Sequence, residues 1–237
     1  MSARLTVSPN ALGAAIVCAA RVLALLGKAL DREEFATFAV SGGSTPGPMF
    51  DTLATRLPWD RVHLFWVDER AVAPTAEASN YKLAYDHLIA PAGIPERNVH
   101  RIHGELEPRE AARLYTAEIR RYFELGSTEL PRFDVVHRGI GPDGHTASLF
   151  PGSDLLDNHD DIAAPVFAPQ FNQWRVTLLP GVLKAARNTV VLAAGADKAE
   201  AVRAVFQDGY DPKKWPSQIA RDQAHWFLDR AAAAKLL

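Results

Sequence analysis

The sequence feature that most constrains the fold is a regular alternation of two kinds of segment. Short runs rich in β-branched and aromatic residues, typical of buried strands, alternate with longer segments of helical period. The strands are predicted at residues 35–40, 61–67, 133–140, 175–179 and 189–194. The helices are predicted near 10–30, 46–56, 79–89, 108–125, 180–187 and 197–208, with a last helix after Asp229. This alternation predicts an α/β fold: a doubly wound, mostly parallel, Rossmann-like sheet with helices on both faces.

The chain shows no internal repeat, low-complexity tract or obvious domain boundary. Its 237 residues, 48% of them hydrophobic, are enough to bury one full core, so we expect a single α/β domain over 1–237. Two stretches rich in proline and aspartate, 71–78 and 151–170, are predicted to be loops on the rim of the sheet.

Charge and cysteine content limit the partners and the compartment. A net charge of -2 offers no basic footprint for nucleic acid or for a membrane surface, so we expect neither as a partner. The single cysteine, Cys18, cannot form an internal disulfide and fits a reducing cytoplasm. The apolar stretch 11–30 is interrupted by Arg21 and Lys28 and lacks the layout of a secretory signal, so it is predicted to be a helix packed on the domain.

Ligands of such sheets bind outside the carboxyl ends of the strands, and the first predicted strand is followed there by "SGGSTP". Gly42 and Gly43 allow a tight turn, and Ser41, Ser44 and Thr45 add hydroxyl and amide donors before a helix that begins near a proline. These residues predict a cradle for a phosphate or carboxylate. An ordinary strand-to-helix turn would have the same composition, and the spacing matches neither the dinucleotide fingerprint nor the nucleoside-triphosphate loop.

The next two segments carry weaker signals. "WVDER" places Asp68, Glu69 and Arg70 directly after a strand, where they would form a buried ion pair, a base, an arginine aimed at an anion, or simply an exposed loop. "SNYKLAYDHL" begins with Ser79 as a candidate N-cap, and Asn80 then lies at a helix start that would face the cleft. A well-capped surface helix explains the second segment better than a direct catalytic role for Asn80.

The strongest chemical signal is "GIGPDGHTASLFPG", residues 139–152. Its glycines permit a tight loop at the end of a strand that presents His145, and Asp143 is close enough in sequence to fix the tautomer of the imidazole. This arrangement indicates proton abstraction from water or substrate. A hydrogen-bonded structural histidine is the alternative.

Two cations complete the candidate site. Arg175 begins a predicted strand and Lys198 follows the bend at Gly195, so both would reach a phosphate held by the cradle, although isolated arginines and lysines are usually solvated. The histidines show no pair at metal-ligand spacing on one helix face, and no Gly-x-Ser-x-Gly elbow is present. We therefore expect neither a catalytic metal nor a nucleophilic serine.

Taken in order, these motifs resemble the 6-phosphogluconolactonase family. "SGGSTP", "WVDER", "SNYKLAYDHL" and "GIGPDGHTASLFPG" are followed by "RVTL", "GADK" and a closing "HWFLDRAAAAKL", so the resemblance runs from about residue 8 to the C-terminus. It implies a fold similar to glucosamine-6-phosphate deaminase, hydrolysis of 6-phospho-D-glucono-1,5-lactone in the oxidative pentose phosphate pathway, no cofactor, and a cytoplasmic monomer or small homo-oligomer.

The resemblance also implies roles for individual residues. His145 resembles the base that activates water, and Asp143 matches the acid of the same motif. The phosphate and substrate contacts it implies are Ser41, Gly42, Gly43, Ser44, Thr45, Asp68, Arg70, Arg175 and Lys198.

The chain departs from the family pattern in two places. His137 and Arg138 stand where an apolar pair is expected before "GIG", and a strand buried on both faces tolerates them only if paired. Either the end of this strand faces solvent or the cleft, or Arg138 meets an acid such as Asp68 or Glu69. Gly181 after Pro180 is expected only to shift the start of a helix.

Two other functions share part of this pattern. A glucosamine-6-phosphate deaminase/isomerase would carry a glutamate five residues beyond the motif histidine, and this chain has Phe150 there. A non-catalytic sugar-phosphate sensor would need a DNA-binding module, and residues 1–34 supply one helix with no basic excess.

Overall fold

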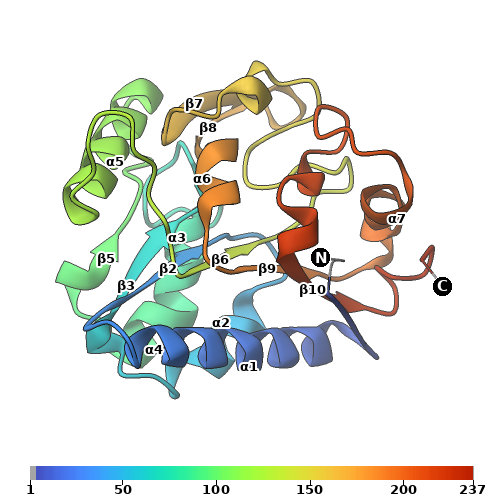
Figure 1. Ribbon diagram of the computed structural model, residues 1–237, viewed down its shortest axis with the longest axis horizontal. Coiled ribbons are helices and arrows are strands. Elements are labelled where there is room, and N and C mark those ends of the chain that lie inside the picture. The colour runs from blue at the N-terminus through green and yellow to red at the C-terminus, as the bar shows by residue number, and fades with distance from the viewer. Residues whose placement is uncertain (1–3, 237) are drawn as a thin grey trace.

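The computed structural model describes residues 4–236 of the chain, and its central feature is a seven-stranded parallel sheet (Figure 1). The strand order across this sheet is β1-β10-β9-β6-β2-β3-β5. The bounds are β1 Arg4–Ser8, β2 Ala36–Val40, β3 Val62–Trp66, β5 Val99–His100, β6 Val135–Arg138, β9 Thr189–Ala193 and β10 Ala224–Asp229. All six pairings within the sheet are parallel.

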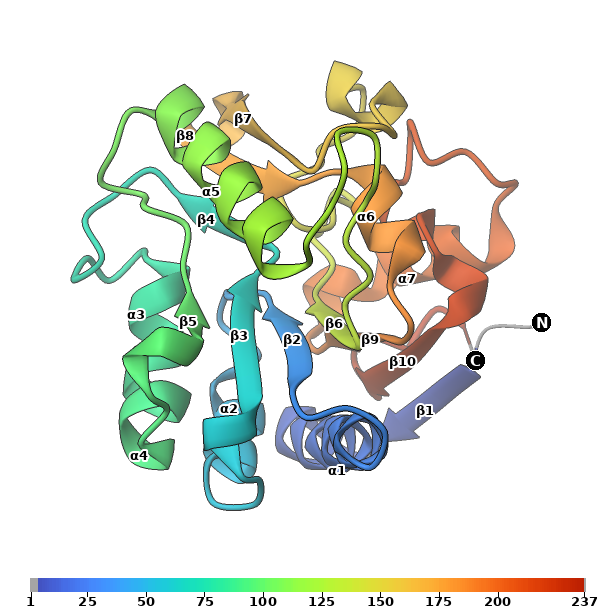
Figure 2. The same ribbon diagram turned by 60° about the vertical axis from the view of Figure 1, so that its left-hand side comes forward.

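Helices cover both faces of this sheet, as the sequence predicts (Figure 2). The helices on one side are α1 Ala11–Leu30, α2 Gly47–Ala54, α3 Asn80–Ala84 with a π-helical turn Tyr85–Ile89, and α4 Ala90–Ala92. Those on the other side are α5 Pro108–Tyr122, α6 Pro180–Ala185 and α7 Ala199–Gln207. The doubly wound, mostly parallel α/β prediction is confirmed.

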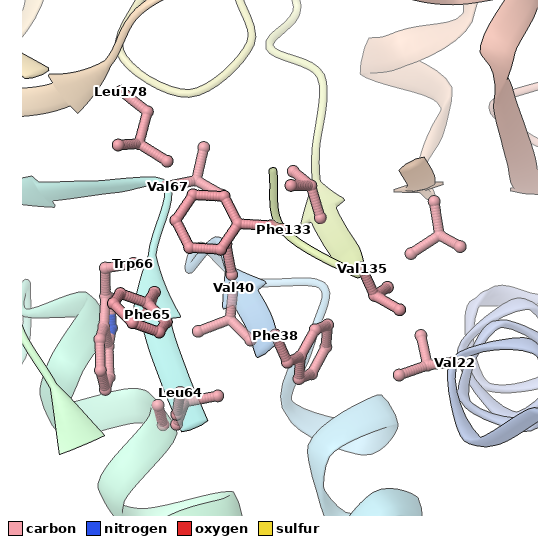
Figure 3. Close-up of a cluster of buried hydrophobic side chains, with 14 of the residues drawn as sticks. Val22, Phe38, Val40, Leu64, Phe65, Trp66, Val67, Phe133, Val135 and Leu178 are labelled. Carbon is pink, nitrogen blue, oxygen red and sulfur yellow. The ribbon is translucent and has the colours of Figure 1, made fainter. Parts of the chain in front are cut away.

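The strands are apolar on both faces because helices cover both faces. Every residue of β2 and β9 is buried, and neither strand shows the alternation of a half-exposed strand. Side chains from neighbouring strands fill the core, with Phe38 of β2, Phe65 of β3 and Val135 of β6 close together (Figure 3). Removal of this apolar area from water is the main term that stabilises the fold.

A second, antiparallel sheet of three strands was not predicted. It has the order β4-β8-β7, with β4 Asp68–Arg70, β7 Ala163–Ala168 and β8 Gln173–Leu178. The strand expected at 175–179 therefore belongs to this sheet and not to the main one, and part of the loop expected at 151–170 forms its edge strand. Helix α5 packs against β7 and β8 (Figure 1).

Three strands of the main sheet were also missed, and the expected last helix is absent. β1 and β5 are short edge strands, with five and two residues, and give little periodic signal. "AHWFLD" forms β10, paired between β1 and β9, and residues 230–236 after Asp229 make turns and no helix. The alanine-rich composition of residues 230–236 favours a helix, but this short segment forms hydrogen-bonded turns after β10, because it offers too few residues for a helix to propagate.

Helix α1 is long and apolar enough to span a membrane by length and composition alone. In this structure one side of it packs against β9, β10 and β2, and buries residues such as Cys18 and Val22. The side chain of Asn10 caps its first turn by accepting from the amide of Gly13. The prediction of a helix packed on the sheet is confirmed.

The direction of winding reverses between β2 and β6. From β2 the chain proceeds outward to β3 and β5, and it then returns to β6 and continues through β9 and β10 on the other side. Because the order reverses here, the loops after β2 and β6 diverge and leave a crevice at the carboxyl edge. At the beginnings of the same two strands, Asp134 joins the two halves, since its carboxylate accepts from both the amide and the hydroxyl of Thr37.

The unusual pair at the end of β6 is buried. His137 is 2% exposed, packs edge-on against Phe50 and accepts weakly from the amide of Ser41 at 3.4 Å, and burial lowers the pKa of its imidazole to about 3. His137 lines the cleft described below, so the first alternative, a strand end that faces the cleft, holds for His137.

Neither alternative holds for Arg138. It is 1% exposed and donates to the carbonyl of Ile219, and within residues 4–236 it has no carboxylate partner. The expected ion pair with Asp68 or Glu69 is therefore wrong. Burial lowers the pKa of the Arg138 guanidinium to about 10, which reflects the cost of keeping a charge in this apolar layer.

Replacement of Arg138 by methionine is expected to stabilise the protein. The thioether fills a similar volume without a buried charge, so the free energy of unfolding should rise by about 1–3 kcal/mol in urea titrations. Arg138→Lys is the matched control, and it should bring no gain because it keeps the charge. A loss of stability in Arg138→Met would show that the guanidinium contributes more than its burial costs.

Candidate active site

A cavity of about 430 Å³ lies in the crevice between the loops that follow β2 and β6. The predicted residues that line it are Ser41, Gly42, Gly43, Ser44, Thr45, Asp68, Arg70, His145, Arg175 and Lys198. The remaining predicted residue, Asp143, contacts the His145 side chain. Residues spread over more than 150 positions of the sequence thus meet at one place.

The loop after β2 forms one wall of the cavity and leads into α2. Gly43 has φ +99°, a conformation that glycine adopts without strain, and the loop ends at Pro46, the N-cap of α2. Gly42 lies so close to Asn80 that a Cβ would be 2.0 Å from its Oδ1. This close packing fixes the loop along the cavity directly before the N-terminus of α2, which is a favourable position for an anion.

Asp68 forms the buried floor of the cavity. It is 3% exposed, and its carboxylate accepts from the hydroxyl of Ser148 at 2.7 Å and more weakly from the hydroxyl of Ser41 at 3.3 Å. The side chain of Asn80 donates to the backbone carbonyl of Asp68 at 2.8 Å. These contacts fix the carboxylate with respect to the phosphate cradle.

Glu69 points away from the cavity and has a structural role. Its carboxylate accepts from the amides of Arg70, Asn80 and Tyr81 and from the hydroxyl of Ser79. Burial raises the pKa of Glu69, while these four donors oppose the rise. Glu69 thus anchors the start of α3 to β4, and Ser79 caps that helix as predicted.

Two arginines face each other across the antiparallel pair of β4 and β8. Arg70 lies directly opposite Arg175 in the register, and like charges so placed repel unless an anion lies between them. Burial lowers the pKa of Arg175, and the charge of Arg70 lowers it further, whereas Asp68 raises it. This pairing within a cavity is the arrangement that an anionic ligand stabilises.

Aromatic rings hold Arg175 in place. Its guanidinium lies 4.6 Å from the ring centre of Phe171 and 5.6 Å from that of Phe150. Lys198 enters from the turn before α7 and pairs with the exposed carboxylate of Asp197 at 2.9 Å. Three cationic side chains from three segments, Arg70, Arg175 and Lys198, therefore line the same cavity as the cradle.

His145 lies on the opposite wall, and its ring is held by Asp143. The Nδ1 atom of His145 is 2.6 Å from Oδ1 of Asp143, which also accepts the backbone amide of His145 at 3.1 Å. Burial alone would raise the pKa of Asp143, but the hydrogen bond and charge of His145 outweigh it and keep that pKa below its ordinary value. With Nδ1–H donating to this carboxylate, Nε2 is the nitrogen that can accept a proton.

Gly141 makes room for the imidazole. A Cβ at this position would lie 2.0 Å from Nδ1 of His145, so Gly141→Ala is expected to displace the ring while the fold persists. The rate of the reaction should fall at least about tenfold, because a displacement of about 1 Å is enough for such losses. Steady-state kinetics measure the loss of rate, and a thermal melt checks that the fold persists.

Gly27→Ala, in helix α1, is the matched control. A new Cβ there meets nothing within 4 Å and lies outside the cavity, so activity should stay within about twofold of the unmodified protein. Equal losses in both variants would contradict the argument from the space around His145.

Several residues of the cavity were not predicted as site residues. Phe171 comes from the short turn between β7 and β8, and Leu192 and Ala193 come from the end of β9. The rule that ligands lie at carboxyl strand ends identifies the end of β9, but nothing in the sequence brings the hairpin that carries Phe171 over the cleft. Among the described residues, no group of three His, Cys, Asp or Glu side chains is arranged to hold a metal ion.

Comparison with known proteins finds relatives over most of the chain. Residues 9–228 match the family model described as glucosamine-6-phosphate isomerases/6-phosphogluconolactonase. The chain is 34% identical to 6-phosphogluconolactonase of Synechocystis sp. over 226 residues, which cover 94% of this chain and 92% of the relative. It is 37% identical to the Homo sapiens enzyme of that name over 210 residues, 82% of this chain and 80% of the relative.

A solved structure shows the same fold. The structure of 6-phosphogluconolactonase from Trypanosoma brucei superposes with a TM-score of 0.88, at 25% identity, over 100% of this chain and 99% of that one. The doubly wound fold, the order of the motifs and the cleft thus point to the same family.

Proposed function

The chain belongs to the family of glucosamine-6-phosphate isomerases and 6-phosphogluconolactonases, and we propose that it hydrolyses 6-phospho-D-glucono-1,5-lactone to 6-phospho-D-gluconate. The observation that carries this proposal is the composition of the cleft: the Ser41–Thr45 loop and cationic side chains line the same cavity as an oriented imidazole. A substrate with a phosphate at one end and a reactive carbonyl at the other fits both parts.

The phosphate is held far from the bond that breaks. Arg175 and Lys198 supply charge, and the loop of Ser41–Thr45 at the start of α2 supplies amide and hydroxyl donors. Binding energy obtained at the phosphate then orients the lactone carbonyl toward His145, which reduces the entropic part of the barrier.

The chemical step needs one base and one water. Nε2 of His145 takes a proton from water as the oxygen adds to C1 of the lactone, and Asp143 stabilises the imidazolium that forms. The bond between C1 and the ring oxygen then breaks, and the proton held by His145 passes to that oxygen. The product is the open-chain acid, and His145 is again neutral.

Negative charge on the carbonyl oxygen during attack needs a donor. The amides of Gly141, Gly144 and His145 already donate within their own loop. Arg70 lines the cavity beside Arg175 and is the donor we assign to this oxygen.

Phe150 argues against an isomerase activity. Its ring lies 4.8 Å from that of His145, centre to centre, where the resemblance implies a glutamate in sugar isomerases. A phenyl ring cannot relay a proton, so water activation suits the site better than proton shuttling on a sugar. A non-catalytic sensor would have no need for the short contact between Asp143 and His145.

The setting of the reaction follows from the sequence. We propose a cytoplasmic monomer or small homo-oligomer made of a single domain over 1–237, with no cofactor and with the sugar-phosphate lactone as its small-molecule substrate. Cys18 is buried in α1, free of a disulfide, which suits a reducing compartment.

Initial rates on two substrates test the proposal. Freshly generated 6-phosphoglucono-1,5-lactone should open faster with the protein than without it, and glucosamine 6-phosphate should release no ammonia. Ammonia release with no acceleration of lactone opening would contradict the lactonase proposal and would assign a glucosamine-6-phosphate deaminase activity.

A further inference from the structure

A second hollow lies at the opposite edge of the main sheet. Its volume is about 800 Å³, and it is lined by the first residues of three parallel strands, Arg4 of β1, Thr189 of β9 and Ala224 of β10. The candidate active site lies at the other end of β9, at Leu192 and Ala193. The two cavities are therefore separate, and a ligand in one leaves the other accessible.

This hollow, the amino-edge cavity, is strongly basic. Its cationic lining side chains are Arg4, Arg21, Arg132, Lys184 and Arg187. The one carboxylate in the lining, Asp222, is already paired with Arg221 at 2.8 Å. An adjoining hollow of about 360 Å³ shares Arg21, Arg132 and Arg187 with it and adds two further cations, Lys28 and Arg32, and two carboxylates, Glu33 and Asp134.

This density of positive charge is exceptional for a chain whose net charge is -2. Within residues 4–236, Arg187 pairs with Asp134 at 3.3 Å, and no ion pair involves Arg4, Arg21, Arg132 or Lys184. Four segments of the chain, at residues 4, 21, 132 and 184–187, bring these charges together, so the cluster is not a run of basic residues on one solvated helix face. A field of this kind attracts anions.

Two residues that line the cavity also carry buried polar atoms without partners. Nε of Arg21 and Nδ1 of His225 are buried and have no hydrogen-bond partner within the described residues. Nε2 of His225 is bonded to the hydroxyl of Thr6. Burial, and after it the charges of Arg21 and Arg4, lower the pKa of His225, which shows that both arginines act on this point of the cavity.

We propose that the amino-edge cavity binds a small molecule that carries several phosphate groups. Its size lies within the range of small-molecule sites, and five cations around it exceed what a single phosphate can contact. The lining offers small apolar side chains, Leu25, Ala185 and Ala186, but no exposed aromatic ring on which the bases of a nucleic acid strand would stack. A compact polyphosphate therefore fits better than a polymer.

Titration calorimetry with inorganic triphosphate tests this site. The titrations are run both without and with saturating 6-phosphogluconate, which on the proposed function fills the candidate active site and prevents it from contributing. We expect one triphosphate to bind per chain, and the double variant Arg132→Glu/Lys184→Glu to weaken binding at least about tenfold. Both side chains are exposed and make no hydrogen bond among the described residues, so the variant should fold.

A matched double variant controls for the overall change of charge. Arg56→Glu/Arg109→Glu alters the net charge equally, at exposed arginines that line none of the cavities described, and should change the affinity less than about twofold. Arg132→Gln/Lys184→Gln should give a smaller loss than the glutamate pair. ATP and triphosphate are compared in the same way: tighter binding of ATP identifies a nucleotide, and equal affinity identifies a polyphosphate.

Three results would overturn the proposal. They are no heat of binding with either probe, equal weakening in the two glutamate variants, or binding that disappears when 6-phosphogluconate is added. The first two would leave the basic cluster as a solvated surface, and the third would assign the phosphate to the site already described.

Discussion

Replacement of His145 by alanine is expected to reduce kcat/KM for 6-phosphogluconolactone by roughly 10²- to 10⁴-fold, the usual contribution of a positioned general base. The loss should fall on kcat, because the imidazole acts on water in the chemical step while the phosphate contacts persist on the other side of the cleft. Stopped-flow assays corrected for spontaneous opening of the lactone measure this effect.

His159→Ala is the matched control for that variant. His159 is exposed, lines none of the cavities described and makes no side-chain hydrogen bond among the described residues, so its loss should leave kcat/KM within about twofold of the unmodified protein. If His145→Ala retained more than about a tenth of the activity, another group would have to serve as the base.

Replacement of Arg175 by alanine is expected to remove the preference for the phosphorylated substrate. A charge-assisted hydrogen bond contributes about 1.5–3 kcal/mol, so kcat/KM for the phosphorylated lactone should fall roughly 10- to 150-fold. The rate with unphosphorylated gluconolactone should change much less, because that substrate has no group for Arg175 to bind. The ratio of the two kcat/KM values isolates the phosphate contact.

Arg175 is also packed between aromatic rings, so stability has to be separated from binding. Lys198→Ala removes a second cation from a more exposed turn, and should lower the same ratio with little change in the melting temperature. Equal losses on both substrates in both variants would show that these cations support the fold and do not anchor the phosphate.

Much of the site could be predicted because its motifs are local. The loops of Ser41–Thr45 and of Asp143–His145 follow buried strands directly, and the rule for carboxyl strand ends then places them at one edge. Buried parallel strands are also visible as short apolar runs, which is why β2, β3, β6 and β9 were found.

The remaining features depend on tertiary pairing. β4 and β7 join β8 in a second sheet whose residues give no distinct periodic signal, and that sheet sets Arg70 opposite Arg175 and carries Phe171 toward the cleft. Glu69 was grouped with Asp68 because the two are adjacent, yet side chains alternate along a strand, so Glu69 turns to the start of α3.

One comparison tests whether this cleft is a lactonase site that requires the phosphate of its substrate. The kcat/KM of the unmodified protein is measured for 6-phosphogluconolactone and for gluconolactone, each against spontaneous opening. We expect strong acceleration of the first and at least about tenfold weaker acceleration of the second. Equal acceleration of both lactones, or none of either, would contradict it.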